Sequence, residues 1–181
     1  MILLRTDDTL GSPGCYLSFR MLSLNMAVTL RPVEPDDEGF LFELFCRSQG
    51  NELGALDATH RDAILKMQYH AQLQTYNAEF PSAVHQIIML ERQVIGRVLV
   101  ERTESEHRGV DIALMPEYRG GGIGTMLIQN LLDEAAGAGK PFRISVVRGN
   151  PALHLYERLG FKKTDENVTH ILLEWAAEPK G

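Results

Sequence analysis

Two patterns of apolar and polar positions divide the chain into short strands and amphipathic helices. Runs of about four to eight residues that are apolar, or that alternate between apolar and polar, favour strands. Apolar residues spaced three and four positions apart favour helices. Strands are therefore predicted at residues 28–31, 83–90, 94–101, 109–115, 142–147, 161–164 and 168–175. Helices are predicted from Asp36 or Asp37 to about 49, over 59–78, from a glycine loop to about 138, and over 150–159.

This order of strands and helices predicts one domain of the α/β (α+β) class. The chain has 181 residues, 44% of them hydrophobic, which is enough for a full-sized core. We expect a single domain over residues 26–177. Residues 1–25 carry no clear pattern, and Met26 offers a later start, so we interpret them as a loosely ordered N-terminal extension or an over-called start.

Charge and cysteine content narrow the class of protein. The net charge is −6 and no basic stripe is present, which argues against a nucleic-acid partner. No apolar run approaches the length of a membrane span, so we expect no membrane segment. Cys15 and Cys46 form neither a disulfide framework nor a metal motif. We therefore expect a cytoplasmic protein without a metal site.

The stretch from Asp111 to Asp133 carries the clearest chemical signal. A short apolar strand turns at Pro116, passes through a glycine loop and becomes a helix with one apolar stripe. A loop without Cβ atoms lets a phosphate approach the backbone, where free N–H groups and the positive end of the helix dipole meet its charge. The loop consists of Arg119, Gly120, Gly121, Gly122, Ile123, Gly124 and Thr125.

The glycine loop differs from two well-known phosphate-binding loops and resembles a third. Thr125 follows Gly124 without the lysine of a nucleotide P-loop, and no early βαβ unit surrounds the glycines as in a dinucleotide fingerprint. The order Arg119-Gly-Gly-Gly122-Ile-Gly124 resembles the acyl-CoA loop of the GCN5-related N-acetyltransferase (GNAT) superfamily, Arg/Gln-x-x-Gly-x-Gly/Ala. A glycine-rich helix start that binds nothing is the alternative for this loop taken alone.

A second segment downstream is similar to the same family. Asn150, Tyr156, Gly160 and Phe161 match the family's Asn, short helix and Tyr-x-x-x-Gly-Phe ending. The two segments cover about 50 residues and the strand order about 150. The resemblance implies the GNAT fold: a central, mixed, mostly antiparallel sheet of about seven strands, flanked by helices, with a splayed strand pair at the acyl-CoA site. Asn-to-Tyr spacing is six here, where many relatives have seven.

The resemblance also implies an activity and a set of binding residues. The activity is transfer of an acetyl group from acetyl-CoA to a primary amine, directly in a ternary complex and without a metal. Backbone groups of Ala113, Leu114 and Met115 would hold the pantetheine arm, and one N–H there would hold the thioester oxygen. The pyrophosphate would lie on the N–H groups of Arg119 to Thr125. Asn150 would bond a pantetheine amide or an ordered water, or cap the helix ahead of Pro151.

Tyr156 is the candidate general acid, and the general base is harder to assign. A phenol with a pKa near ~10 can protonate a departing thiolate with a pKa near ~8.5, but the ring could instead only pack on Phe161. Better-known relatives place a Glu at positions that hold Ser145 or Gly109 here. The local candidates for the base are Asp111, Glu101 and His85, although a lone Asp, Glu or His on a strand is more often structural. Water could also carry the proton, or the amine could enter neutral.

The acceptor and the partners stay open at the level of sequence. In the resembled family the two helices near the N-terminus shape the acceptor pocket, so Tyr69, Tyr76 and Phe80 either line it or pack in the core. A small-molecule amine is favoured over a protein, and the resemblance allows a homodimer. The alternatives are a non-catalytic acyl-CoA-binding or sensing module and a protein or peptide N-acetyltransferase. A nucleotide-binding domain of another class is a more remote one.

Overall fold

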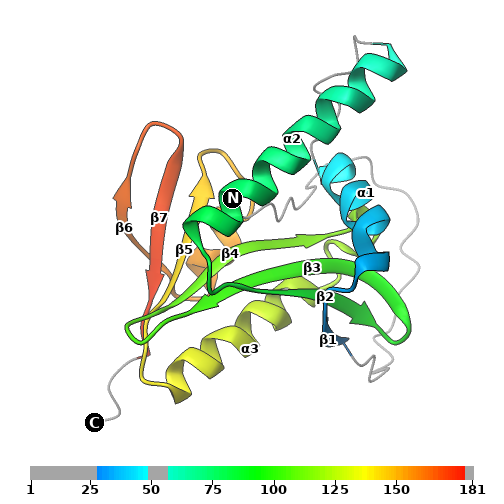
Figure 1. Ribbon diagram of the computed structural model, residues 1–181. Helices are drawn as coiled ribbons and strands as arrows, with labels where there is room; N and C mark the ends of the chain where they lie inside the picture. The colour runs from blue at the N-terminus through cyan, green and yellow to red at the C-terminus, as the bar shows by residue number, and fades with distance from the viewer. Residues whose placement is uncertain (1–27, 49–56, 178–181) are drawn as a thin grey trace, which may run out of the picture.

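The strands and helices lie close to where the apolar pattern predicts them. The computed structural model describes residues 28–48 and 57–177 (Figure 1). The strands are β1 (Val28–Pro32), β2 (Val84–Leu90), β3 (Gln93–Arg102), β4 (His107–Leu114), β5 (Phe142–Val147), β6 (Lys162–Glu166) and β7 (His170–Trp175). The helices are α1 (Glu38–Ser48), α2 (Ala58–Glu79), α3 (Ile123–Gly137) and α4 (Leu153–Arg158), with 3-10 turns at Pro35–Asp37 and Pro116–Tyr118. The prediction for residues 1–25 lies outside the described residues.

Three boundaries differ from the prediction for local reasons. β4 begins at His107, inside the predicted loop, because β3 and β4 stay paired as far as Arg102 and His107. β7 begins at His170 rather than 168 because the Asn167 side chain accepts hydrogen bonds from the amides of Thr169 and His170, which makes a turn there. α4 is likewise shorter than predicted, because residues 150–152 form a turn before it.

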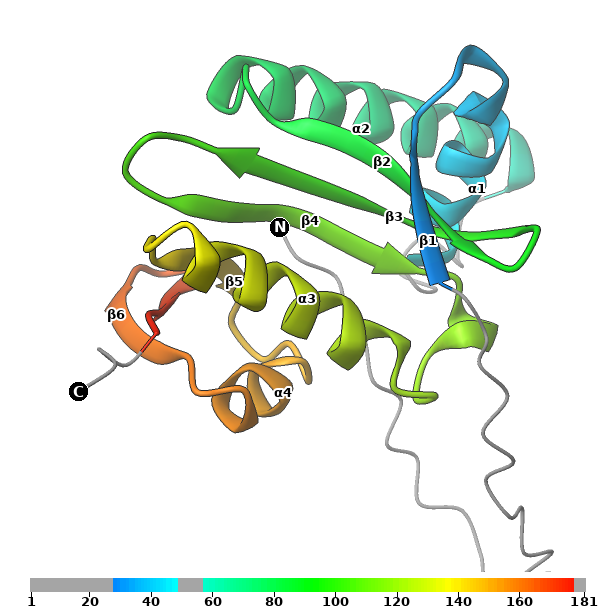
Figure 2. The same cartoon turned by 90° about the horizontal axis from the view of Figure 1, so that it is seen from below.

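The strands form one open sheet in the order β1-β2-β3-β4-β5-β7-β6. Only the β4–β5 pair is parallel, and the other neighbours are antiparallel. Figure 2 shows α1 and α2 on one face of the sheet and α3 and α4 on the other. The predicted fold class, a mixed and mostly antiparallel sheet of seven strands flanked by helices, is confirmed.

Two apolar layers hold the helices on the sheet. The layer under α3 and α4 is the larger, and α3 contributes the stripe that the sequence predicts, consisting of Leu127, Ile128, Leu131, Leu132 and Ala135. Burying one such large side chain stabilises the fold by about 1.5–3 kcal/mol. On the other face, Leu41 and Phe45 of α1 and Tyr69 of α2 pack on Ile87. Both faces of the central strands are therefore buried, and their backbone edges are exposed only where neighbouring strands part.

The sheet opens between β4 and β5. These strands pair only at His107–Phe142, Arg108–Arg143 and Gly109–Ile144, although both continue beyond that point. A Cβ atom on Gly109 would come within 3.1 Å of Ile144 and Phe142, so glycine allows the close approach of the last pair. The predicted splayed pair is confirmed.

A β-bulge lies at the start of the opening. The register of β3 and β4 shifts between Leu99 and Val100, which leaves Val110 as the extra residue on β4. Val110 packs against Tyr76 and Leu99 under α2, and Asp111 binds Arg97 on that same face. The bulge therefore turns two consecutive side chains of β4 toward α2, which regular strand alternation does not allow.

Candidate active site

The opened edge of β4 presents peptide groups to the gap. Met115 donates its N–H to Ile95 O at 2.9 Å, so Met115 belongs to a hydrogen-bonded pair with β3. Because such pairs alternate along an antiparallel ladder, Ile112 and Leu114 direct their peptide groups away from β3 and toward the gap. Arg119 Nε reaches back to donate to Leu114 O at 2.9 Å. The Ala113–Met115 segment thus lies on the opened strand, with the side chains of Ala113 and Met115 packed near α1.

The glycine loop continues directly from this edge. Gly120 and Gly122 have φ of 75° and 84°, values that L side chains rarely adopt. A Cβ atom on Gly120, Gly121 or Gly122 would meet no other atom within 4 Å, so the space above the loop is open. Glycine is thus required by backbone conformation at two of these positions and leaves room at all three.

The loop amides are available to an anion. The first helical hydrogen bond of α3 runs from Met126 N–H to Gly122 O at 3.0 Å. The amides of residues 120–125 precede it, and in the described part of the chain none of them donates to a protein acceptor. These N–H groups and the positive end of a 15-residue helix make a phosphate-sized anion site.

Tyr156 of α4 has a buried hydroxyl without a hydrogen-bond partner among the described residues. Its side chain is 0% exposed and packs edge-on against Phe161, with 5.4 Å between ring centroids. The hydroxyl is buried and has no hydrogen-bond partner among the described residues. Burial raises the pKa of Tyr156, and the negative charge of Asp111 raises it further, so the phenol stays protonated at neutral pH. An unpaired buried hydroxyl is costly, which favours a ligand atom as its missing partner.

Asn150 closes the turn that leads from β5 into α4. Its N–H donates to Val147 O at 3.1 Å, and Gly149 between them has φ of 78°. Its side-chain Oδ1 accepts from Ala152 N–H at 2.9 Å. Asn150 thus stabilises the turn ahead of α4, whose N-cap is Ala152 rather than Asn150, and a contact with the pantetheine arm stays a prediction.

Asp111 is held by a buried arginine. Arg97 Nε and Nη2 lie 2.7 and 2.5 Å from Asp111 Oδ2, and Gln72 accepts a further hydrogen bond from Arg97 Nη2. Arg97 and Asp111 are 4% and 1% exposed. The sequence analysis missed Arg97, although a charged residue inside the apolar run 94–100 was the available signal. The pair gives Asp111 a structural role, whatever part it plays in proton transfer.

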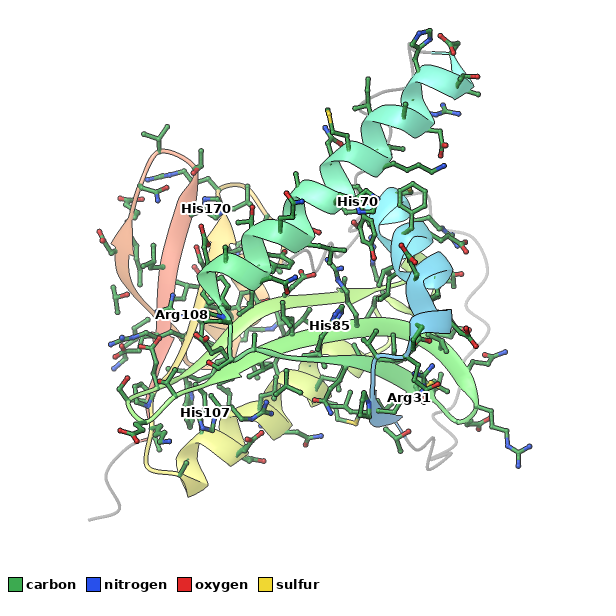
Figure 3. All side chains as sticks on the ribbon, viewed as in Figure 1. Arg31, His70, His85, His107, Arg108 and His170 are labelled. Atoms are coloured by element: carbon green, nitrogen blue, oxygen red, sulfur yellow. The ribbon has the colours of Figure 1, made fainter. Side chains whose placement is uncertain are left out.

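The other two candidate bases lie in different surroundings. Glu101, near the end of β3, accepts a hydrogen bond from Ser82 Oγ at 2.7 Å. His85 lies on β2 under α2, as labelled in Figure 3, and its Nε2 is buried without a hydrogen-bond partner among the described residues. Burial and the charge of Arg97 lower the pKa of His85 to about 4, so its imidazole is neutral at pH 7.

Replacing Asp111 with asparagine is expected to lower the free energy of unfolding by about 3 kcal/mol, because Arg97 would remain buried without its counter-charge. Urea unfolding at neutral pH measures this change. Glu101→Gln, which alters an exposed hydrogen bond, is the control and should have a much smaller effect. A similar small loss in both variants would show that the buried pair is not what holds this part of the sheet.

A cavity lies on the α2 side of the opening. Its volume is about 610 Å³, and it is lined by the C-terminal half of α2, by β4 and β5 where they part, by β7, and by the turn between β6 and β7. Of the predicted acceptor-side aromatics, Tyr76 and Phe80 line this cavity, whereas Tyr69 packs in the core against Phe42 and Phe45. The size is typical of small-molecule sites.

The described residues contain neither a metal-binding cluster nor a membrane-spanning helix. No group of three or more His, Cys, Asp or Glu side chains is placed to hold a metal ion. No helix there has the length and apolar character needed to cross a membrane.

Comparison with known proteins points to one family. A family model described as an acetyltransferase (GNAT) domain matches residues 82–163. No curated protein matches the chain. A PaiA N-acetyltransferase from Thermoplasma acidophilum, solved in complex with coenzyme A, has a similar fold, with a TM-score of 0.64, 18% identity, and coverage of 84% of this chain and 100% of that chain.

Two further solved structures share the fold. The ribosomal-protein-S18-alanine N-acetyltransferase from Escherichia coli gives a TM-score of 0.57 at 16% identity, over 86% of this chain and 97% of that one. A spermidine N-acetyltransferase chimera of Vibrio cholerae SpeG and hSSAT gives 0.59 at 20% identity, over 82% and 95%. At these identities the similarity establishes the fold, and the matched family model covers the strand, loop and helix of the site.

Proposed function

Because the chain belongs to the GCN5-related N-acetyltransferase superfamily, we propose that it transfers an acetyl group from acetyl-CoA to a primary amine. The observation that carries this proposal is a set of three groups of hydrogen-bond donors without protein acceptors. They are the amides of the glycine loop, the outward peptide groups of β4, and the hydroxyl of Tyr156. None of these N–H and O–H donors has a protein acceptor among the described residues, and the phosphate, amide and sulfur atoms of acetyl-CoA would supply acceptors.

The residues fit acetyl-CoA as the co-substrate. The loop amides at 120–125 would bind its pyrophosphate, and the outward peptide groups of Ile112 would pair with the extended pantetheine arm as a missing strand would. The N–H of Leu114, which points into the gap, would donate to the thioester oxygen as negative charge develops there. Acetyl-CoA itself supplies the activated acetyl group and a thiolate leaving group.

Tyr156 would donate the proton that the leaving thiolate needs. Its phenol is protonated at neutral pH, and its position in α4 is fixed by packing against Phe161. A buried donor of this kind acts without first losing a water molecule. A direct transfer is favoured because Cys46, the cysteine among the described residues, has a pKa raised by burial and is therefore a weak nucleophile.

The amine would approach from the α2 side, through the cavity of about 610 Å³. This size supports a small-molecule acceptor over a folded protein. Asp111 and Glu101 remain the candidate bases, and Asp111 would act only while its second oxygen stays clear of Arg97. A water-mediated path from the amine, or an amine that binds already neutral, fits the same surroundings.

The test is thiol release from acetyl-CoA across amino acids, polyamines, aminoglycosides and short peptides, with the acetylated product identified by mass spectrometry. The proposal expects one class of amine to give release with one acetyl group per thiol. A non-catalytic acyl-CoA sensor is the second candidate, favoured by the ion pair that holds Asp111 and by the lowered pKa of His85. It predicts tight acetyl-CoA binding with no acetylated product from any amine.

A further inference from the structure

Around the acceptor cavity, the positive charge is neutralised by ion pairs and the negative charges are not. Arg108 is the cavity's arginine, and its Nε and Nη2 both donate to Glu106 Oε1, at 2.9 and 2.6 Å. Glu106 also binds Arg143, which in turn binds Glu174 at 2.6 Å. These four side chains form a connected group with no net charge. The positive charge of Arg108 is therefore matched before any ligand enters.

The carboxylates near the cavity lack such partners. Glu79, at the C-terminal end of α2, lines the cavity and pairs with no cation in the described part of the chain. Glu101 lies directly opposite Arg108 on β3, and its recorded contact is with the neutral hydroxyl of Ser82. Two negative charges near the cavity are thus not matched by ion pairs.

The remaining walls add no positive charge. Burial lowers the pKa of His170, so its imidazole is neutral at pH 7. Figure 3 shows Arg108 and His170 beside the C-terminal half of α2. The rings of Tyr76 and Phe80 complete this part of the cavity, and the guanidinium groups that lie over them, of Arg97 and Arg108, are both paired with carboxylates. The local field therefore favours a positively charged ligand over a carboxylate.

We propose that the acceptor is a small amine with a second positive charge, bound at Glu79 while the reacting amine lies where β4 and β5 part. This inference rests on the proposed function and names its substrate class. Tyr76 packs on Val110 at the opening, and Glu79 follows three residues later on α2. Three residues span about 4.5 Å of helix axis, so a diamine with nitrogens roughly 5–7 Å apart reaches both places.

Three amines of equal chain length test the effect of the charge at the end of the substrate that does not react. They are 1,4-diaminobutane, butylamine and 4-aminobutanoate, whose far ends are positive, neutral and negative. The expected kcat/KM falls in that order, by about five- to tenfold at each step, because one partly exposed ion pair or like-charge contact changes each time. The differences should shrink as salt is added.

Substitution of Glu79 tests the assigned contact without threatening the fold, since this side chain is exposed and unpaired among the described residues. Glu79→Gln should remove the advantage of 1,4-diaminobutane over butylamine, and Glu79→Lys should shift the preference toward 4-aminobutanoate. The control is Asp62→Asn, because Asp62 lies on the same helix but pairs with Lys66 and does not line the cavity. This variant should keep the wild-type order.

The outcomes separate the inference from the proposed function. Equal kcat/KM for diaminobutane and butylamine, or an unchanged preference in Glu79→Gln, would overturn the inference. Acetylation of peptides or amino acids with none of the three test amines would also overturn it and would leave an N-acetyltransferase in place. Failure to acetylate any amine would refute the proposed function, and the inference with it.

Discussion

Gly121→Glu is expected to weaken acetyl-CoA binding about a thousandfold, as measured by titration calorimetry. Gly121 lies between the two loop glycines with positive φ, and a Cβ atom there would meet nothing within 4 Å. A carboxylate at this position would lie beside the pyrophosphate and extend into its space. Two like charges about 4 Å apart cost roughly 4 kcal/mol at an effective dielectric constant of ~20. That energy corresponds to about a thousandfold in Kd.

Gly121→Lys is the matched control for this experiment. It adds a side chain of similar length to the same backbone position but brings a positive charge, so acetyl-CoA should bind at least as tightly as to the wild-type protein. Gly122 is a poorer site for the test, because its φ of 84° would strain any side chain and confuse charge with misfolding. Equal affinity of the Glu and Lys variants for acetyl-CoA would show that the pyrophosphate does not bind beside Gly121.

Tyr156→Phe is expected to lower kcat by about two to four orders of magnitude while changing the Kd for acetyl-CoA little. The substitution removes the hydroxyl that has no protein partner among the described residues and keeps the ring that packs on Phe161. The loss therefore falls on proton transfer to the leaving thiolate rather than on the core. Steady-state thiol release at saturating acetyl-CoA, together with calorimetric titration, separates the two quantities.

Tyr118→Phe supplies the comparison for the phenol. The exposed Tyr118 hydroxyl donates to Gln93 at 2.9 Å, so its removal should leave kcat close to that of the wild type. A Tyr156→Phe enzyme with full kcat would remove the proton-donor role and leave the packing interpretation of this residue. Parallel loss of stability and kcat in Tyr156→Phe would also point to packing, and urea unfolding detects that case.

The sequence predicts those parts of the fold that depend on periodicity and on steric rules. In the described part of the chain, apolar spacing located the helices and most strands, because these elements bury one face against the sheet or the helices. β6 is the exception, since all five of its residues are exposed. The glycine loop was recognisable because positive φ at Gly120 and Gly122 excludes most other residues. Asn150 was recognisable as a turn residue from its position before Pro151, although the helix begins later and its N-cap is Ala152.

The features that the sequence did not predict depend on contacts between distant elements. The bulge at Val110 leaves no local signature, yet it places Val110 and Asp111 on the same face. Arg97 meets Asp111 and Gln72 only because α2 crosses β3 and β4. The acceptor cavity likewise combines α2 with strands and a turn that are separated along the chain by up to about a hundred residues. The net charge around the cavity could not be predicted from the sequence, because it depends on the ion pairs that Arg108 and Arg143 form.

Amide hydrogen exchange with and without acetyl-CoA tests the central claim most directly. The claim is that the loop amides at 120–125 and the outward amides of Ile112 and Leu114 bind one ligand along the opening between β4 and β5. Saturating acetyl-CoA should slow exchange in peptides that cover residues 110–126, with little change in β1 or α1. Acetyl-CoA that binds but protects another part of the chain, or that does not bind, would contradict the account.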